Sequence, residues 1–212
     1  MSYDRVMAEY TLNPVWLLVG ILLVILGIIQ AVAFSDPHFY TAFSVGLTML
    51  MLSIYRLMFK KDFFKGWSTG QFTLYIVASL VACIIIDQIG ISLGYWHYPK
   101  YSGLLDEGLK YFFEWFVAFQ YLMLAFVICR EFIYKTTQNL LLSILVGLVG
   151  VSIVGLFTEF LNHSASSWQV LSMPITNLKI GSYFIVFQTI GYWLTALIPL
   201  FIYSFVAKLR LK

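Results

Sequence analysis

The stretch NLLLSILVGLVGVSIVGLFTEFL, residues 139–161, is long and apolar enough to cross a membrane. A spanning helix needs about 20 mostly apolar residues, and the only charged side chain in this stretch is that of Glu159, close to its end. An ionisable group costs about 2.5–3.5 kcal/mol at the centre of an inserted helix, so an acid in such a place normally faces a protected interior and marks a site. The stretch therefore predicts both a membrane protein and the position of a functional residue.

Five further stretches meet the same length rule, and together the six predict an all-α polytopic membrane protein, a six-helix bundle. Of the 212 residues, 61% are hydrophobic, 18% aromatic and 11% charged, with a mean hydropathy of +0.87. A soluble domain of this size cannot bury so much apolar surface. We expect one integral membrane domain over residues 1–212, whose first apolar run is a retained span and not a removed signal peptide. The expected spans are 14–34, 40–59, 70–93, 111–133, 139–161 and 182–207.

The Lys and Arg residues are divided unevenly between the two ends of the predicted bundle. Six spans put both termini on one side, and cytoplasmic loops carry the excess of Lys and Arg. The pattern predicts cytoplasmic termini and a place in the cell membrane. The formal charge of +3 and the pI near 8.8 come from scattered residues, which do not indicate a nucleic-acid partner. The terminal side carries Arg5, Arg56, Lys60, Lys61, Lys65, Arg130, Lys135, Lys208, Arg210 and Lys212, and the opposite side carries Lys100, Lys110 and Lys179.

Three acids, Asp87, Glu114 and Glu159, are expected at comparable depth in the outer half of the bundle, and we take them as catalytic candidates. A buried carboxyl group can stay protonated and give its proton to a substrate, and two acids in different surroundings can act as acid and base. Nearby aromatic faces would stabilise a cation. The plainer alternatives are hydrogen bonding between helices and, for the aromatic residues, anchoring at the membrane interface. The substrate-binding candidates are Trp96, Trp115, Gln120, Asn162, His163, Trp168, Gln188 and Tyr192.

The third and fifth spans end in the same pattern. Asp87 precedes Trp96 by the same spacing with which Glu159 precedes Trp168. Because both units run in the same direction, they predict parallel repeats related by an axis along the membrane normal, with a shared site at their interface. A chance likeness between two apolar hairpins is the alternative. The helices that follow carry matching pairs, Phe119-Gln120 and Phe187-Gln188.

Several kinds of site are disfavoured by the motifs that the sequence lacks. The three histidines have no HxxxH or HExxH spacing, and there is no Gly-rich phosphate loop, no Asp-rich diphosphate motif and no nucleophile elbow. We therefore expect no metal ion and no cofactor. Cys83 and Cys129 are interpreted as two free buried thiols.

The segment DQIGISLGYWHYP, from Asp87 to Pro99, is followed after a short polar loop by Glu114 at the head of an aromatic helix. This arrangement resembles the lycopene cyclase domain of small membrane carotenoid cyclases, and the part from Glu159 to Gln188 resembles it more loosely. The resemblance implies an isomerase or intramolecular lyase that protonates a long isoprenoid polyene, lets the cation close a ring and removes a proton. By position, Asp87 matches the first acid of the family and Trp96 its aromatic residue, and Glu114 matches the acid that opens the next helix.

The sequence departs from that family in two places. The family opens this helix with Pro-x-Glu-Glu, but here the residues are Phe112-Phe113-Glu114-Trp115, which lack the proline and the second glutamate. In the second unit, Ile185-Val186 stand where an acid would be expected. A carotenoid hydratase, a terpenoid cyclase or a non-catalytic relative would use similar parts.

Two other classes of function stay open. A binding or transport subunit would have an outward-facing polar pocket under loops 94–110 and 162–181 for a small amine, vitamin or ion; the polar second loop favours it, and the lack of matched broken helices disfavours it. A scaffold would use the acids to join helices and have no cavity. The enzyme predicts an apolar cavity open sideways to lipid. The expected partners are the lipid bilayer and a hydrophobic isoprenoid or another small-molecule ligand, and a homo-oligomer is left open.

Overall fold

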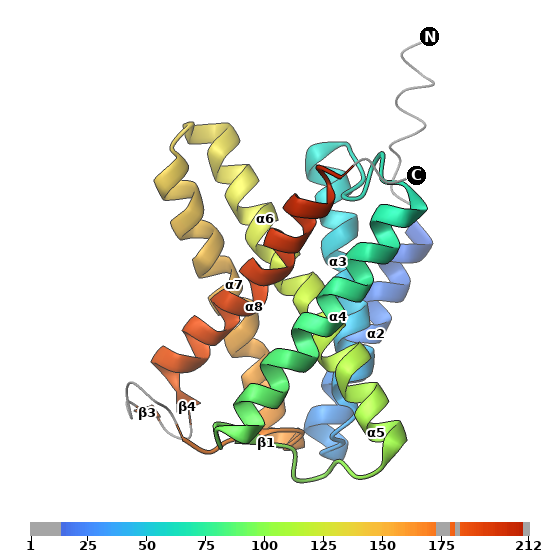
Figure 1. The fold of residues 1–212 in the computed structure, drawn as a ribbon, viewed down its shortest axis with the longest axis vertical. Helices are drawn as coiled ribbons and strands as arrows, with labels where there is room; N and C mark the ends of the chain where they lie inside the picture. The colour runs from blue at the N-terminus through green and yellow to red at the C-terminus, as the bar shows by residue number, and fades with distance from the viewer. Residues whose placement is uncertain (1–13, 173–178, 181–182, 210–212) are drawn as a thin grey trace.

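The computed structural model describes residues 14–172, 179–180 and 183–209, which form an all-α membrane protein with four very short strands (Figure 1). Six helices of the described chain are long and apolar enough to span a membrane, which confirms the predicted fold class. The helices are α2 (Pro14–Phe34), α3 (Phe39–Phe59), α4 (Thr69–Ser92), α5 (Leu104–Leu109), the π-helix η1 (Lys110–Phe116), α6 (Val117–Thr137), α7 (Leu140–Ala165) and α8 (Ile185–Val206). The strands are β1 (Trp96–His97), β2 (Gln169–Val170), β3 (Lys179–Ile180) and β4 (Tyr183–Phe184).

The fourth span differs most from its predicted bounds. It was expected to begin at residue 111 after a loop, but the structure has one continuous helical segment over Leu104–Thr137. Two acids in its first turn, Asp106 and Glu107, favour the earlier start because they interact well with the positive end of the helix dipole. The predicted first residue of the last span, 182, lies outside the described residues, as do Arg5, Arg210 and Lys212.

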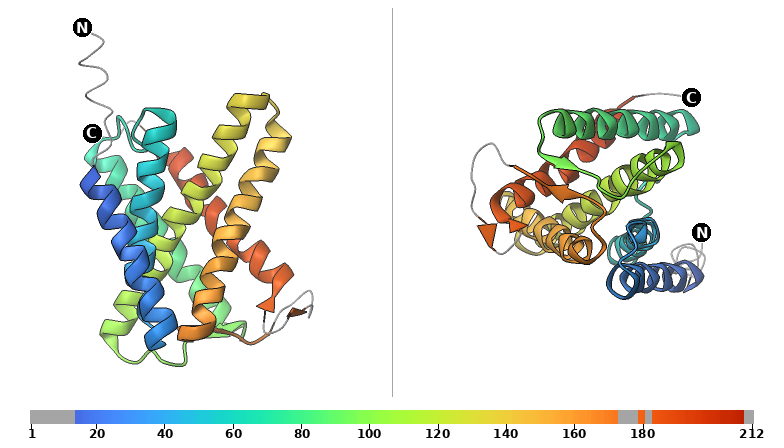
Figure 2. Two further views of the ribbon diagram at one scale, coloured as in Figure 1. Left: turned by 180° about the vertical axis from the view of Figure 1, so that it is seen from behind. Right: turned by 90° about the horizontal axis from the view of Figure 1, so that it is seen from below.

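Helix α6 lies at the centre of the bundle, where it packs against α3, α7 and α8 (Figure 2). Its residues from Val117 to Ile128 are buried without interruption. The most apolar part of this span is 78% buried, against 17–28% for the other five spans. The outer helices therefore present their apolar side chains outward, as contact with a lipid bilayer requires.

The two ends of the bundle differ in structure. One end holds the start of α2, the end of α8 and the basic loop between α3 and α4, whereas the opposite end holds β1, β2 and the turn between α2 and α3 (Figure 1). Strands β1 and β2 pair antiparallel, which joins the loop after α4 to the loop after α7. This pairing was not predicted from the sequence, and it brings the two acid–tryptophan units together.

The register of β1 and β2 supports the predicted repeat. If Trp96 corresponds to Trp168, then His97 corresponds to Gln169 and the next residue, Tyr98, to Val170. The structure pairs His97 with Gln169 and Trp96 with Val170. A twofold axis between the two strands produces this pattern. It pairs His97 with its own counterpart, Gln169, and it pairs Trp96 with the counterpart of Tyr98, which is Val170.

Candidate functional site

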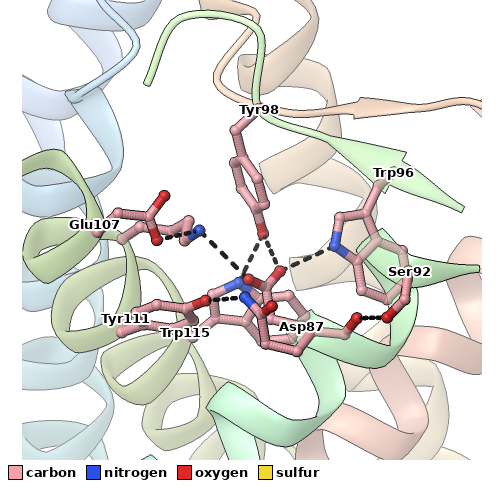
Figure 3. Close-up of polar contacts among 9 residues, drawn as sticks. Asp87, Ser92, Trp96, Tyr98, Glu107, Tyr111 and Trp115 are labelled. Carbon is pink, nitrogen blue, oxygen red and sulfur yellow. Dashed lines mark hydrogen bonds and ion pairs between the residues drawn. The ribbon is translucent and has the colours of Figure 1, made fainter. Parts of the chain in front are cut away.

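Asp87, near the end of α4, is fully buried and bound by three side chains (Figure 3). Its Oδ1 accepts hydrogen bonds from Trp96 Nε1 at 2.9 Å and from the Tyr98 hydroxyl at 2.7 Å. Its Oδ2 lies 3.5 Å from Lys110 Nζ. This carboxyl group is therefore held by two neutral donors and one cation.

Lys110 is only 2% exposed and begins the π-helix η1. Besides Asp87, its Nζ contacts Glu107 Oε2 at 2.7 Å and lies 4.6 Å from the ring centroid of Tyr98. A π-helical turn is wider than an α-helical one and occurs often at functional sites. Both Lys110 and Glu114 are buried residues of this π-helix.

Tyr98 lies in the loop after α4 and connects Asp87 to the opposite wall of the site. Its hydroxyl oxygen accepts a hydrogen bond from Trp115 Nε1 at 2.7 Å while it donates to Asp87. Burial raises the pKa of the Tyr98 hydroxyl well above its usual value, and the charge of Asp87 raises it further. The Tyr98 phenol therefore stays neutral, and its hydroxyl donates a hydrogen bond to Asp87.

Glu159, on α7, repeats the pattern of the first unit with a different second donor. Its Oε1 accepts hydrogen bonds from Trp168 Nε1 at 3.1 Å and from the Tyr192 hydroxyl at 2.6 Å. Asn162 stabilises the turn that places Trp168 next to Glu159. Its Oδ1 accepts hydrogen bonds from the backbone N–H groups of Ser167 and Trp168. In both units the indole thus binds the acid that precedes it, which supports the repeat that the equal spacing predicted.

The carboxyl group of Glu114 has a hydrogen-bond partner at one oxygen and, unlike that of Asp87, has no cation beside the other among the described residues. The hydroxyl of Tyr101 donates to its Oε1 and also lies 3.0 Å from the carbonyl oxygen of Pro37. Its Oε2 is buried and has no hydrogen-bond partner among the described residues. The side chain as a whole is only 5% exposed.

Glu114 and Glu159 line one cavity of about 260 Å³ between the helices. Gln188 also lines it and, like Glu114, has a buried oxygen, Oε1, without a partner among the described residues. The rest of the wall is mostly aliphatic and aromatic. Its aromatic members are Tyr40, Trp96, Tyr98, Trp115, Trp168 and Tyr192.

The structure divides the predicted site residues into two groups. Seven line the cavity, and the other four lie elsewhere. Asp87 does not line the cavity, but it binds Trp96 and Tyr98, which do. Gln120 Oε1 accepts a hydrogen bond from the Tyr75 hydroxyl at 2.6 Å. Asn162 supports the turn at Trp168, and His163 is exposed on α7. The lining residues are Trp96, Glu114, Trp115, Glu159, Trp168, Gln188 and Tyr192.

Sequence reasoning missed Lys110, Tyr40, Tyr98 and Tyr101. Lys110 was counted as a topology signal, although its place one helical turn before Glu114 was a usable sign. Tyr40 lines the cavity from α3, and its hydroxyl bonds to that of Tyr121. No sequence pattern marks it, because its place depends on how α3 packs against α6.

Within the described ranges, no three His, Cys, Asp or Glu residues come close enough to hold a metal ion. Cys83 and Cys129 are free thiols, as predicted, but only Cys83 is buried, because Cys129 is partly exposed. Comparisons of the chain with protein-family models, with curated proteins and with solved structures found no match.

Proposed function

We propose that the protein is a membrane-embedded enzyme that protonates an isoprenoid polyene and closes a ring, without a cofactor. The observation that carries this proposal is the unpartnered Glu114 Oε2 at the wall of an apolar, aromatic cavity. A buried polar atom without a protein partner is costly and calls for a partner in the working complex. An acid at the wall of an apolar chamber is suited to give a proton to a carbon–carbon double bond.

The hydrogen bonds of the two cavity acids assign them different roles. Glu114 is the proton donor, because it lines the cavity and one of its oxygens has no hydrogen-bond partner among the described residues, while Tyr101 donates to the other. Glu159 is the base, since it accepts from two donors, Trp168 and Tyr192, whereas Glu114 accepts from one, so the carboxylate form is favoured more at Glu159 than at Glu114. Acid and base roles divide in this way when two carboxyl groups have different surroundings.

The proposed reaction needs no oxidant or reductant. Glu114 transfers its proton to one carbon of a terminal double bond, and a cation forms on the neighbouring carbon. A second double bond attacks this cation, which closes the ring and moves the charge. Glu159 then takes a proton from a carbon beside the new cation, and the electrons of that C–H bond form a double bond. The aromatic faces of the wall stabilise the passing charge.

The size and position of the cavity fit one end of a long substrate. Pockets for small molecules commonly have volumes of about 300–1,000 Å³, so 260 Å³ accommodates an end group rather than a whole long polyene. Leu194 lines the cavity and is 55% exposed on the membrane-spanning helix α8. This exposure supports a mouth on the lipid side, through which the rest of a polyene would extend into the bilayer.

Asp87 is assigned a positioning role in this proposal. It holds Trp96 and Tyr98, which both line the cavity, but does not line the cavity itself. The resemblance to the lycopene cyclase domain rests on Asp87, Trp96 and Glu114, and two of these three line the cavity. That agreement adds support to the cyclase proposal, although the Pro-x-Glu-Glu motif is missing.

The second candidate function is the binding or transport of a small organic cation. Two glutamates and six aromatic rings around a small cavity are also the groups that bind an ammonium ion. This candidate predicts tight binding of a tetraalkylammonium probe and no chemical change in a polyene. The mostly apolar wall favours the enzyme.

The test is conversion of a linear polyene in bacteria engineered to accumulate lycopene. Pigments are extracted from cells that express the wild type or the Glu114→Gln, Glu159→Gln and Asp87→Asn variants, and ring formation is followed by chromatography and absorption spectra. General acid–base groups contribute about 10²–10⁴-fold in rate, so Glu114→Gln and Glu159→Gln should each lower conversion at least a hundredfold.

The matched control is Glu131→Gln, which changes an acid that pairs with Lys61 at 3.6 Å and does not line the cavity. This variant should convert the polyene as the wild type does, and immunoblots should show equal amounts of every variant in the membrane. Unchanged products in both glutamate variants, or no conversion by the wild type, would reject the cyclase proposal.

A further inference from the structure

The cavity has a second unpartnered polar atom that the proton-transfer proposal does not use. This atom is Gln188 Oε1, and the side chain of Gln188 is only 7% exposed. An amide oxygen buried without a partner costs free energy, and native structures commonly provide such atoms with a ligand or a water molecule. A pure hydrocarbon would leave it unpaired.

The orientation of the Gln188 amide follows from its neighbour. The amide group of Gln188 lies next to the carboxyl group of Glu159. A carboxylate only accepts hydrogen bonds, so the NH₂ group of the amide faces Glu159 and its oxygen is left for the cavity. The missing partner of Gln188 is therefore a hydrogen-bond donor.

The rest of the wall limits what this donor can be. Ile86, Leu122 and Ile198 line the cavity together with the aromatic rings, so the body of the ligand must be apolar. A ketone or an ether cannot donate to Gln188. A hydroxyl group donates to the Gln188 oxygen and can also accept from Glu114, the other residue with a free oxygen in this wall.

We propose that the cavity binds an isoprenoid end group that carries an uncharged hydroxyl, and that this hydroxyl donates a hydrogen bond to Gln188 Oε1. The inference rests on the proposed function and deepens it: among isoprenoid end groups, the site should prefer those that carry a hydroxyl over those that do not. Gln188 becomes the specificity-determining residue of the site, and Glu114 keeps its role as the acid.

The test compares two ten-carbon probes that share one skeleton, the alcohol geraniol and the hydrocarbon 2,6-dimethylocta-2,6-diene. Protein in lipid nanodiscs is titrated with each probe, with concentrations expressed per lipid. Binding is followed by tryptophan fluorescence, since Trp96, Trp115 and Trp168 line the cavity. The ratio of the two dissociation constants is compared between variants, so that differences in how the probes partition into lipid cancel.

The wild type should bind both probes, and Gln188→Leu should reduce the preference for the alcohol about two- to tenfold, the range expected from one net hydrogen bond. Gln188→Met, which keeps an unbranched side chain, should reduce the preference for the alcohol by a similar factor. It keeps the test informative if the leucine variant does not fold. The matched control is Gln30→Leu. Gln30 also has a buried oxygen without a partner among the described residues, but it lies at the end of α2, outside the cavity wall.

The preference for geraniol should be unchanged in Gln30→Leu. An unchanged preference in both Gln188 variants, an equal loss in Gln30→Leu, or binding of neither probe would overturn the proposed hydroxyl site. The conversion assay separates the two proposals. Alcohol preference without conversion of any polyene would overturn the cyclase and leave the hydroxyl site standing, and conversion without alcohol preference would do the reverse.

Discussion

The two acid–tryptophan units share a design but hold their acids differently. In each unit an indole and a tyrosine hydroxyl donate to one carboxyl oxygen: Trp96 and Tyr98 to Asp87, and Trp168 and Tyr192 to Glu159. Only the first unit adds a buried cation, Lys110. Only the second unit presents its acid to the cavity.

This difference indicates how one pattern can serve two purposes. A buried carboxylate that is paired with a cation and two hydrogen-bond donors has its charge compensated. It therefore has little remaining capacity to bind a ligand or to accept a proton. A carboxylate held by two neutral donors keeps free lone pairs for a proton. We infer that Lys110 turns the first unit into a support for Trp96 and Tyr98, whereas Glu159 is left for chemistry.

The largest expected effect comes from removing the cation of the first unit. Lys110→Met should leave Asp87 buried without its ion-pair partner and lower the free energy of unfolding by about 3–5 kcal/mol, the usual cost of breaking a buried pair. Glu159→Gln should cost less, since it removes no partner of a buried ion. The thermal unfolding midpoint of the detergent-solubilised protein measures both.

The double variant Lys110→Met with Asp87→Asn is the control for this comparison. With the charge of Asp87 also removed, most of the lost stability should return, because buried pairs replaced as a unit are often close to neutral. If Lys110→Met unfolds at the same temperature as the wild type, Lys110 does not distinguish the two units.

An effect of intermediate size is expected from two glycines beneath aromatic rings of the units. A Cβ added at Gly90 would lie 1.9 Å from the ring of Trp96, and one added at Gly155 would lie 2.4 Å from the ring of Tyr192. Such overpacking commonly costs about 1–3 kcal/mol. Gly90→Ala should be the more destabilising, because the displaced ring is a donor to the buried ion pair.

Gly108→Ala is the matched control for these two substitutions. Gly108 lies in α5, and a Cβ there would meet no atom within 4 Å. Its unfolding midpoint should equal or slightly exceed that of the wild type, since alanine favours a helix more than glycine does. Equal midpoints for Gly90→Ala and Gly108→Ala would show that the ring of Trp96 can move without loss.

The fold was predictable because its signals are local in the sequence. Apolar runs of the required length fixed five of the six spans closely, and the spacing from Asp87 to Trp96 and from Glu159 to Trp168 predicted that the two units would match. The early start of the fourth span was missed because Leu104 to Lys110 contains polar and charged residues. In a span that begins outside the bilayer, helix propensity and charge in the first turn matter more than hydropathy.

The site was predictable only in part, because its geometry depends on packing. The sequence marked Glu114 and Glu159, but it could not show that Lys110 pairs with Asp87 and removes it from the cavity. Gln120 and Gln188 each follow a phenylalanine in matching Phe-Gln pairs. Gln120 nevertheless accepts a hydrogen bond from the Tyr75 hydroxyl, whereas Gln188 lines the cavity. Whether such a glutamine lines the cavity or binds another side chain depends on which residues of other helices pack against it. A single sequence does not reveal these contacts.

The smallest expected effect concerns a lysine that links the two units from outside. Lys100, in the loop of the first unit, donates to the carbonyl oxygen of Ala165 at 2.7 Å and to that of Ser35 at 3.2 Å. These carbonyl groups belong to the ends of α7 and α2, where a cation interacts well with the helix dipole. Unlike Lys110, it is exposed.

Lys100→Met should therefore lower the free energy of unfolding by only about 0.3–1 kcal/mol, the usual range for an exposed cation at a helix end. High salt should reduce the difference from the wild type, because it screens exposed charges, whereas the loss in Lys110→Met should persist in salt. Unfolding midpoints of both variants at low and high salt measure this. A loss in Lys100→Met as large as that in Lys110→Met would mean that the link between the units, and not the buried pair, holds the first unit in place.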